Sequence, residues 1–246
     1  MDLNFVCDDG LAQRAAFGLI VLQADETMEN EFRTLFDLKG VTLNHARIPS
    51  APDVTPDTLM RMKEQLTGTA ALLPSARPLD VIGYGCTSAS TIIGSDTVAA
   101  AVQKAHPTAK VTNPAAAVIA ALQKLKVKKI GVVTPYIAEV SKAVVTLLEN
   151  NGFTADKVGS FGQSEEAVVA RIAADSVEAA ICSVGDAPDI EAVFASCTNL
   201  RTFPIIEACE AKLGKPVISS NSALAWHMMQ LAGLETKGRG PGRLFG

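Results

Sequence analysis

The chain contains an internal duplication whose offset is close to half of its 246 residues. Two Cys-Thr pairs mark the duplication, Cys86-Thr87 and Cys197-Thr198, and they are separated by 197 − 86 = 111 residues. Each pair follows an apolar run typical of a strand and precedes a polar residue that could begin a helix. A repeat of this length predicts two similar lobes, because a solenoid repeats at much shorter intervals.

Two further matches extend the duplication beyond the cysteines. Gly18 and Gly131 each lie in an apolar run followed by a helix-like segment, at an offset of 131 − 18 = 113 residues. Asn113 and Asn221 each precede an alanine-rich segment, at an offset of 221 − 113 = 108 residues. Any chain of alternating strands and helices repeats such units, but three matches in one order at nearly one offset favour a true duplication.

Short β-branched runs alternate with longer runs rich in alanine and leucine, a pattern that predicts parallel sheets covered by helices. Strands are predicted at 17–22, 41–47, 80–84, 109–112, 129–133, 154–160, 178–182, 191–195 and 216–219. Helices are predicted at 27–38, 55–73, 88–104, 114–126, 137–150, 164–174, 203–213 and 222–233. We therefore expect an α/β fold with two similar lobes, each a mainly parallel sheet flanked by helices, related by a pseudo-twofold duplication.

The lobes should span 15–113 and 129–235. Helix 114–126 and the last helix are the elements that could cross from one lobe to the other. The segment 236–246 contains several glycines and is expected to be an extended or mobile tail.

Composition excludes several classes of function. The net charge is −4, whereas a nucleic-acid partner requires clustered lysine and arginine. The chain shows neither a secretory signal nor an apolar run long enough to span a membrane. Five cysteines form an odd set without metal-ligand spacing, which favours free thiols in the reducing cytoplasm. We expect a cytoplasmic protein with no membrane or nucleic-acid partner, assembled as a homo-dimer or homo-tetramer.

Both paired cysteines are candidate catalytic residues. A thiol between a strand and a helix N-terminus lies near backbone N–H groups, which should lower its pKa. The hydroxyl groups of Thr87, Ser88 and Thr198 could hold a substrate carboxylate and stabilise an enediolate-like intermediate. A buried cysteine can also be a small packing residue, but two matched contexts favour chemistry.

Ligands of parallel sheets bind beyond the carboxyl ends of strands. The segments 23–26, 86–88, 134–136 and 197–199 all fall there, which adds Gln23 and Asn199 to the candidate substrate-binding residues. Cys7, Cys182 and Cys209 have no matched context and are interpreted as structural. The three histidines share no metal-ligand spacing, and no nucleotide-binding glycine motif is present. The sequence therefore predicts chemistry without a metal or a cofactor.

Six short motifs carry a resemblance to a known group of enzymes. They are 18–21 with 25–29, Gly85-Cys86-Thr87-Ser88, Thr134-Pro135-Tyr136-Ile137, Ser196-Cys197-Thr198-Asn199 and Ser220-Asn221. Over roughly 15–235 the chain resembles the aspartate/glutamate racemase superfamily. Within it, the chain is similar to maleate cis-trans isomerase, arylmalonate decarboxylase and the racemase-like proteins of ectoine-utilisation clusters. The resemblance implies a two-lobed α/β fold, no cofactor, and one or two cysteines in the cleft between the lobes.

The resemblance also suggests roles for individual residues. Cys86 matches the first cysteine of the racemases and maleate isomerases, where arylmalonate decarboxylase has glycine. Cys197 matches a second cysteine that all three groups share. Thr87, Ser88 and Tyr136 match residues that hold a substrate carboxylate in the decarboxylase.

Two departures from maleate isomerase concern charge. Asp25 stands where that enzyme has asparagine, and Glu166 falls near a second asparagine, anchored by Arg171 and Ile172. Two carboxylates facing a dianion such as maleate would repel it, because charges in contact interact by several kcal/mol even at moderate screening. A substrate with an ammonium group would be attracted. Either side chain could instead point to solvent.

The leading hypothesis is a cofactor-independent racemase or epimerase that acts beside the carboxylate of an amino acid or derivative. One thiolate would remove the proton and the opposed thiol would return one to the other face. The alternative is maleate cis-trans isomerisation, with Cys86 as nucleophile and Cys197 as acid. Less favoured are an arylmalonate-type decarboxylase and a non-catalytic binder of small molecules.

Overall fold

The structure is a computed structural model that describes residues 1–246, the whole chain. Two four-stranded sheets form its framework, with strand orders β2-β1-β3-β4 and β6-β5-β7-β8. The first sheet contains β1 (Ala15–Leu22), β2 (Val41–Ile48), β3 (Val81–Gly85) and β4 (Lys110–Thr112). The second contains β5 (Lys129–Tyr136), β6 (Thr154–Gln163), β7 (Ala192–Ala195) and β8 (Val217–Ser219). All neighbouring strands are parallel. The identical orders confirm the predicted α/β fold of two duplicated lobes.

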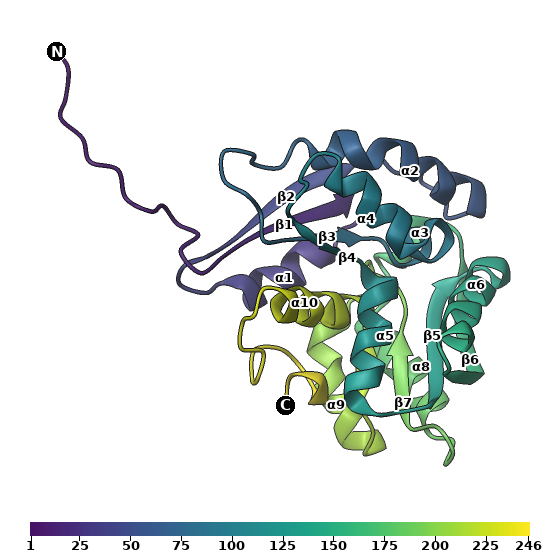
Figure 1. Ribbon diagram of the computed structural model, residues 1–246. Helices are drawn as coiled ribbons and strands as arrows, with labels where there is room; N and C mark the ends of the chain where they lie inside the picture. Colours follow the sequence, from purple (N-terminus) through teal and green to yellow (C-terminus); the bar gives the residue numbers. More distant parts are fainter.

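Ten α-helices and one 3₁₀ helix surround the sheets (Figure 1). In the first half they are α1 (Met28–Phe36), α2 (Pro56–Ala70), α3 (Thr87–Ile93), α4 (Ser95–Gln103) and α5 (Pro114–Leu125). In the second half they are α6 (Ala138–Asn150), α7 (Glu166–Val169), α8 (Ala174–Gly185), α9 (Phe203–Leu213), α10 (Ser220–Leu231) and the 3₁₀ helix η1 (Arg243–Phe245). None of these helices has both the length and the apolar character needed to cross a membrane.

Two hydrophobic cores hold the lobes together. Successive side chains of a strand point to opposite faces, so Ile20 and Leu22 of β1 enter one core while Leu19 and Val21 enter the other. Each core contains residues of both lobes. The lobes are therefore joined through continuous apolar packing, which positions the carboxyl ends of their central strands relative to one another.

The helix that follows the last strand of each lobe packs on the other lobe. α5 follows β4 and contacts β8, α10 and η1, whereas α10 follows β8 and contacts α1, β3 and β4. Figure 1 shows α10 beneath the first sheet, beside α1. The residues at the start of α10 are thereby brought to the junction between the lobes.

Three predicted elements differ from the structure. The segment 178–182 is not a strand, because it belongs to α8, whose buried residues Val177, Ile181 and Val184 have helical spacing. The predicted helix 88–104 is two helices, because Gly94 adopts a φ of 88° between α3 and α4. The predicted helix 164–174 shrinks to α7, and α8 begins at Ala174.

Both chain termini also differ from expectation. The segment 236–246 is not extended or mobile, because Leu244 and Phe245 are buried and the backbone N–H of Arg243 donates to the Glu210 carboxylate. The N-terminal arm before β1 runs away from the body of the protein (Figure 1). Cys7 lies in this arm and is exposed, so its interpretation as a packed structural cysteine is wrong, whereas Cys209 is buried.

Candidate active site

Cys86 lies where β3 ends and α3 begins. It is the N-cap residue of α3, and its sulfur accepts a hydrogen bond from the backbone N–H of Ala89 at 3.4 Å. The hydroxyl of Ser88 lies 3.7 Å from the same sulfur. Gly85 precedes the cysteine, and a Cβ at this position would require the end of the Met28 side chain to shift. The local sequence thus directs the Cys86 thiol into a buried position.

Cys197 occupies the matching position after β7, with a different local structure. No helix begins at this point, and α9 starts only at Phe203. The expectation that a helix N-terminus follows both cysteines is therefore wrong for Cys197. Its sulfur nevertheless accepts a hydrogen bond from the backbone N–H of Asn199 at 3.3 Å. Both thiols are buried and each has one amide donor.

The thiol pKa values run opposite to the expected direction. Burial raises the pKa of Cys86 to about 12 and also raises the pKa of Cys197 well above its ordinary value. The amide donors act in the other direction but are outweighed, because a buried thiolate loses its hydration. Repulsion from the Glu166 and Asp25 carboxylates adds to the rise for both thiols. Both cysteines are therefore neutral thiols at pH 7.

Tyr136 lies close to both cysteines. It is the last residue of β5, and its pKa is raised by burial and then by its proximity to Cys197 and Cys86. Its hydroxyl lies near the Cys197 sulfur and lowers the pKa of that thiol. The phenol therefore stays neutral and can donate a hydrogen bond to a substrate placed between the two thiols.

Ser220 connects the two Cys-Thr pairs. Its hydroxyl accepts hydrogen bonds from the Thr87 hydroxyl at 2.7 Å and from the backbone N–H of Cys197 at 3.1 Å. It is the first residue of α10 and is fully buried. In the sequence, Ser220 stands out only as part of the Ser220-Asn221 motif. The matched position of Asn221 and Asn113 was the available signal that this segment reaches the lobe junction.

Asp25 is a buried carboxylate in the loop between β1 and α1. Its Oδ1 accepts hydrogen bonds from the backbone N–H groups of Thr27 at 2.8 Å and Met28 at 2.7 Å. Its Oδ2 is buried and has no hydrogen-bond partner. Burial raises the pKa of Asp25 to about 6, although the two amides and the nearby Thr198 hydroxyl pull it down. Asp25 therefore carries a negative charge at pH 7 with one oxygen unused.

Glu166 is the second buried carboxylate of the site. It is the first residue of α7, and its Oε2 accepts a hydrogen bond from Asn199 Nδ2 at 3.0 Å. Burial raises the pKa of Glu166, and repulsion from Asp25 raises it further. The structure thus directs both carboxylates inward, and neither points to solvent.

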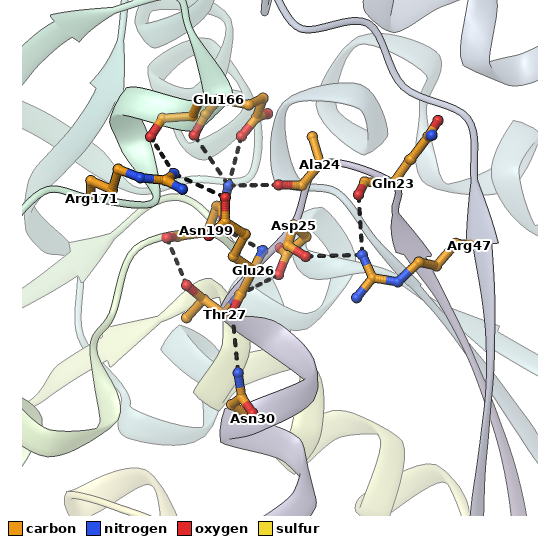
Figure 2. A network of polar contacts seen from close by, with 11 residues as sticks. Gln23, Ala24, Asp25, Glu26, Thr27, Asn30, Arg47, Glu166, Arg171 and Asn199 are labelled. Atoms are coloured by element: carbon orange, nitrogen blue, oxygen red, sulfur yellow. Dashed lines mark hydrogen bonds and ion pairs between the residues drawn. The ribbon is translucent and has the colours of Figure 1, made fainter.

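The other predicted substrate-binding residues fall into two groups. Thr87, Ser88 and Thr198 are buried beside the thiols. Gln23 is exposed, and Figure 2 shows its side chain turned away from the surrounding polar network. The Asn199 amide is occupied by the protein: Nδ2 donates to the Ala24 carbonyl and to Glu166, and Oδ1 accepts from the Glu26 N–H (Figure 2). Asn199 therefore links the loops of the two lobes.

Glu31 forms a second buried link that sequence reasoning missed. Its Oε1 accepts hydrogen bonds from the backbone N–H groups of Thr202 at 2.8 Å and Phe203 at 2.9 Å. Its Oε2 accepts from Asn221 Nδ2 at 2.6 Å, and the same Nδ2 donates to the Thr198 carbonyl. Burial raises the pKa of Glu31 to about 7. This α1 carboxylate therefore holds the loop that carries Cys197.

The site is closed from outside by a seam between the lobes. The Val54 N–H donates to the Ser164 carbonyl, and the Glu166 N–H donates to the Pro52 carbonyl. An ion pair of 2.9 Å between Arg171 and Glu26 also crosses the seam at the surface. A cavity of about 330 Å³ at the lobe junction is lined by neither thiol.

Comparison with known proteins shows the family of this chain. The family model for arylmalonate decarboxylase matches residues 17–245. The maleate isomerase of Nocardia farcinica is 27% identical over 238 residues, which cover 93% of this chain and 94% of the relative. The arylmalonate decarboxylase of Bordetella bronchiseptica is 32% identical over 136 residues, which cover 54% of this chain and 57% of the relative.

Solved structures give the same result. The maleate isomerase Iso of Pseudomonas putida S16 superposes with a TM-score of 0.85 at 25% identity, covering 94% of this chain and 98% of that chain. A cysteine-to-serine mutant of the N. farcinica enzyme, which holds a covalently bound succinylcysteine intermediate, superposes with the same score, identity and coverage. The chain therefore belongs to the arylmalonate decarboxylase family, an enzyme family with cysteine chemistry, and resembles maleate isomerases over nearly its full length.

Proposed function

We propose that the protein is a cofactor-independent isomerase of small carboxylates that works with Cys86 and Cys197. The observation that carries this proposal is the position of the two buried thiols. Each follows the corresponding strand of its lobe, and each lies within the electrostatic reach of Tyr136. A substrate between the lobes would present one face to each sulfur.

The first candidate reaction is cis-trans isomerisation of a small unsaturated carboxylate. The covalent succinylcysteine in the N. farcinica relative supports it. Cys86 would lose its thiol proton to water as the substrate binds, its thiolate would add to one alkene carbon, and the π electrons would move to the other carbon and into its carboxylate. Cys197 would protonate that carbon, and rotation about the new single bond would follow. Removal of a proton from that carbon by the Cys197 thiolate and cleavage of the C–S bond would release the trans product and return both sulfurs to their starting states.

The hydroxyl groups around the sulfurs would hold the reacting carboxylate. Ser88, Thr198 and Tyr136 are buried donors near the thiols, and none of them carries a charge that must be desolvated. Negative charge develops on the carboxylate when the carbanion forms, so donors already in position stabilise it without reorganisation. The chain's own hydroxyl groups would thus stabilise the negative charge of the carbanion intermediate.

A second candidate reaction is racemisation at the carbon beside the carboxylate. The near-equivalence of the two thiols favours it, because each is buried and each accepts one backbone amide. One thiolate would remove the α-proton, the bond electrons would enter the carboxylate, and the opposed thiol would protonate the other face. The roles of Cys86 and Cys197 would exchange for the other enantiomer.

Reaction in deuterated water separates the two candidates. The protein is incubated with maleate and, separately, with single enantiomers of a panel of amino acids, and products are followed by NMR and optical rotation. Cis-trans isomerisation predicts fumarate and a mass increase on Cys86 in the Cys197→Ser variant. Racemisation predicts deuterium at the α-carbon and loss of optical rotation. The proposal fails if none of these signals appears. It also fails if the conversion of substrate persists in a variant that lacks both thiols.

A further inference from the structure

We propose that the substrate carries a positively charged group as well as its carboxylate, and that Asp25 and Glu166 select it. This inference rests on the proposed function, because it describes the ligand of the same site. Asp25 supplies the free oxygen, and Glu166 supplies a second negative charge from the opposite lobe. The predicted ligand is a zwitterion, in contrast to a dianion such as maleate.

One oxygen of the Asp25 carboxylate makes no hydrogen bond in the structure, although the Thr198 hydroxyl lies near this carboxylate. Its Oδ1 is held by two backbone N–H groups, which fix the orientation of the side chain. The other oxygen, Oδ2, is buried without any hydrogen bond. A buried carboxylate oxygen without a partner loses the free energy of its hydration. An ammonium group of the substrate would recover that free energy.

No cation of the protein neutralises the two carboxylates inside the site. Arg47 is the nearest to Asp25, but its guanidinium donates to the Asp25 carbonyl at 3.0 Å and pairs with Glu29 at 2.6 Å. Arg171 follows α7, but it is exposed and pairs with Glu26. The Glu166 carboxylate receives only the neutral Asn199 amide. Arg47 offsets part of the Asp25 charge through space, but no cation forms an ion pair with either carboxylate.

The polar groups of the site divide into two kinds. Neutral donors, the hydroxyls of Ser88, Thr198 and Tyr136, can hold a carboxylate beside the thiols. Asp25 and Glu166 are the acceptors, and each raises the pKa of both thiols by electrostatic repulsion. A bound ammonium group would weaken that repulsion and favour thiolate formation. The substrate itself would then help to activate the cysteines, which are neutral in its absence.

Two probes of similar size test the charge preference directly. β-Alanine is succinate with one carboxylate replaced by an ammonium group, and neither compound reacts with thiols. Binding is measured by calorimetry on wild type, on Asp25→Asn, on Glu166→Gln and on the double variant. Asparagine and glutamine keep the oxygens that accept the existing hydrogen bonds, so the local structure is preserved. Glu165→Gln is the matched control, because it removes an exposed charge from the neighbouring residue.

We expect wild type and Glu165→Gln to bind β-alanine more tightly than succinate. The double variant should shift the preference towards succinate by on the order of tenfold or more, the value of one hydrogen bond to a charged group. Failure of β-alanine to bind wild type, or an unchanged preference in the double variant, overturns the proposal. Binding requires no turnover, so the charge preference can be present or absent whether or not Cys86 acts in catalysis. The same titrations on Cys86→Ser therefore separate a failure of this proposal from a failure of the proposed function.

The pH dependence distinguishes attraction of a cation from donation by a protonated acid. The groups that face Asp25 are Arg47 from β2, Glu31 from α1, Glu166 from α7 and the two thiols. With a pKa of about 6 for Asp25, β-alanine should bind roughly tenfold more tightly at pH 7.5 than at pH 5, because the carboxylate must be ionised. Equal binding of β-alanine at pH 5 and pH 7.5 would show that an ionised Asp25 is not required, which overturns the proposal.

Discussion

Ser220→Ala should separate the positioning of the two thiols from the stability of the fold. The Ser220 hydroxyl is the shared acceptor for the Thr87 hydroxyl and the Cys197 N–H. Alanine removes the acceptor and leaves two donors in a site from which water is excluded. Each unsatisfied buried donor costs about 1–3 kcal/mol, and the Thr87 hydroxyl can rotate to relieve part of this. We expect a loss of about 2–4 kcal/mol in the free energy of unfolding.

The same change should lower turnover more than it lowers affinity. The Cys197 sulfur is held within reach of the substrate by its own backbone, and that backbone is held by Ser220. Displacement of a reacting group by about 1 Å can reduce a rate on the order of 100-fold. We therefore expect kcat to fall by roughly that factor, while KM changes little, in a steady-state assay with the substrate that wild type converts.

Ser222→Ala is the matched control for this prediction. Ser222 is also buried in the first turn of α10, where its hydroxyl accepts from the Ser219 N–H at 2.8 Å. Its loss should cost about 1–2 kcal/mol of stability and leave kcat unchanged, because it contacts neither cysteine loop. Equal kcat values for the two variants would refute the positioning role of Ser220.

Three further changes test the structure at other points. Glu31→Gln should reduce the pH dependence of stability: burial raises the Glu31 pKa from 4.5 to about 7, so the folded state holds that proton more tightly and stability falls as pH rises through this window. Between pH 4.5 and pH 8, the free energy of urea unfolding should fall by about 3 kcal/mol less in the variant than in wild type. An equal fall in both proteins would contradict the assignment. Glu26→Gln breaks an exposed ion pair with Arg171 and should change the unfolding free energy by less than about 1 kcal/mol; a larger loss would mean that the seam depends on it. Deletion of 243–246 removes buried Leu244 and Phe245 and should cost about 3 kcal/mol or more; an unchanged Tm would contradict the packing of the tail.

The duplication was visible in the sequence because it is carried by local patterns. Strand-like runs, the Cys-Thr pairs and the glycines that precede helices all lie within short windows, so the order of elements could be predicted in each lobe. The segment 178–182 failed because a short apolar run fits a buried strand or a buried helix equally well. The spacing of Val177, Ile181 and Val184 was the feature that should have decided for a helix.

The site was only partly predictable because several of its contacts are distant in sequence. Cys86 and Cys197 stand in recognisable motifs, whereas Ser220 meets Thr87 across 133 residues and Glu31 meets Thr202 across 171 residues. No local pattern encodes such pairs. The thiol pKa values were predicted in the wrong direction because helix position is a local property, whereas burial depends on the whole fold.

Turnover by the single cysteine variants is the most direct test of the account. Cys86→Ser and Cys197→Ser are assayed with the substrate that wild type converts, and folding is checked by circular dichroism and thermal unfolding. A hydroxyl is a far weaker acid than a thiol, so we predict that each variant loses at least on the order of 1,000-fold in kcat while its Tm stays close to that of wild type. Near-normal kcat in either folded variant would remove that cysteine from the mechanism and contradict the two-thiol isomerase.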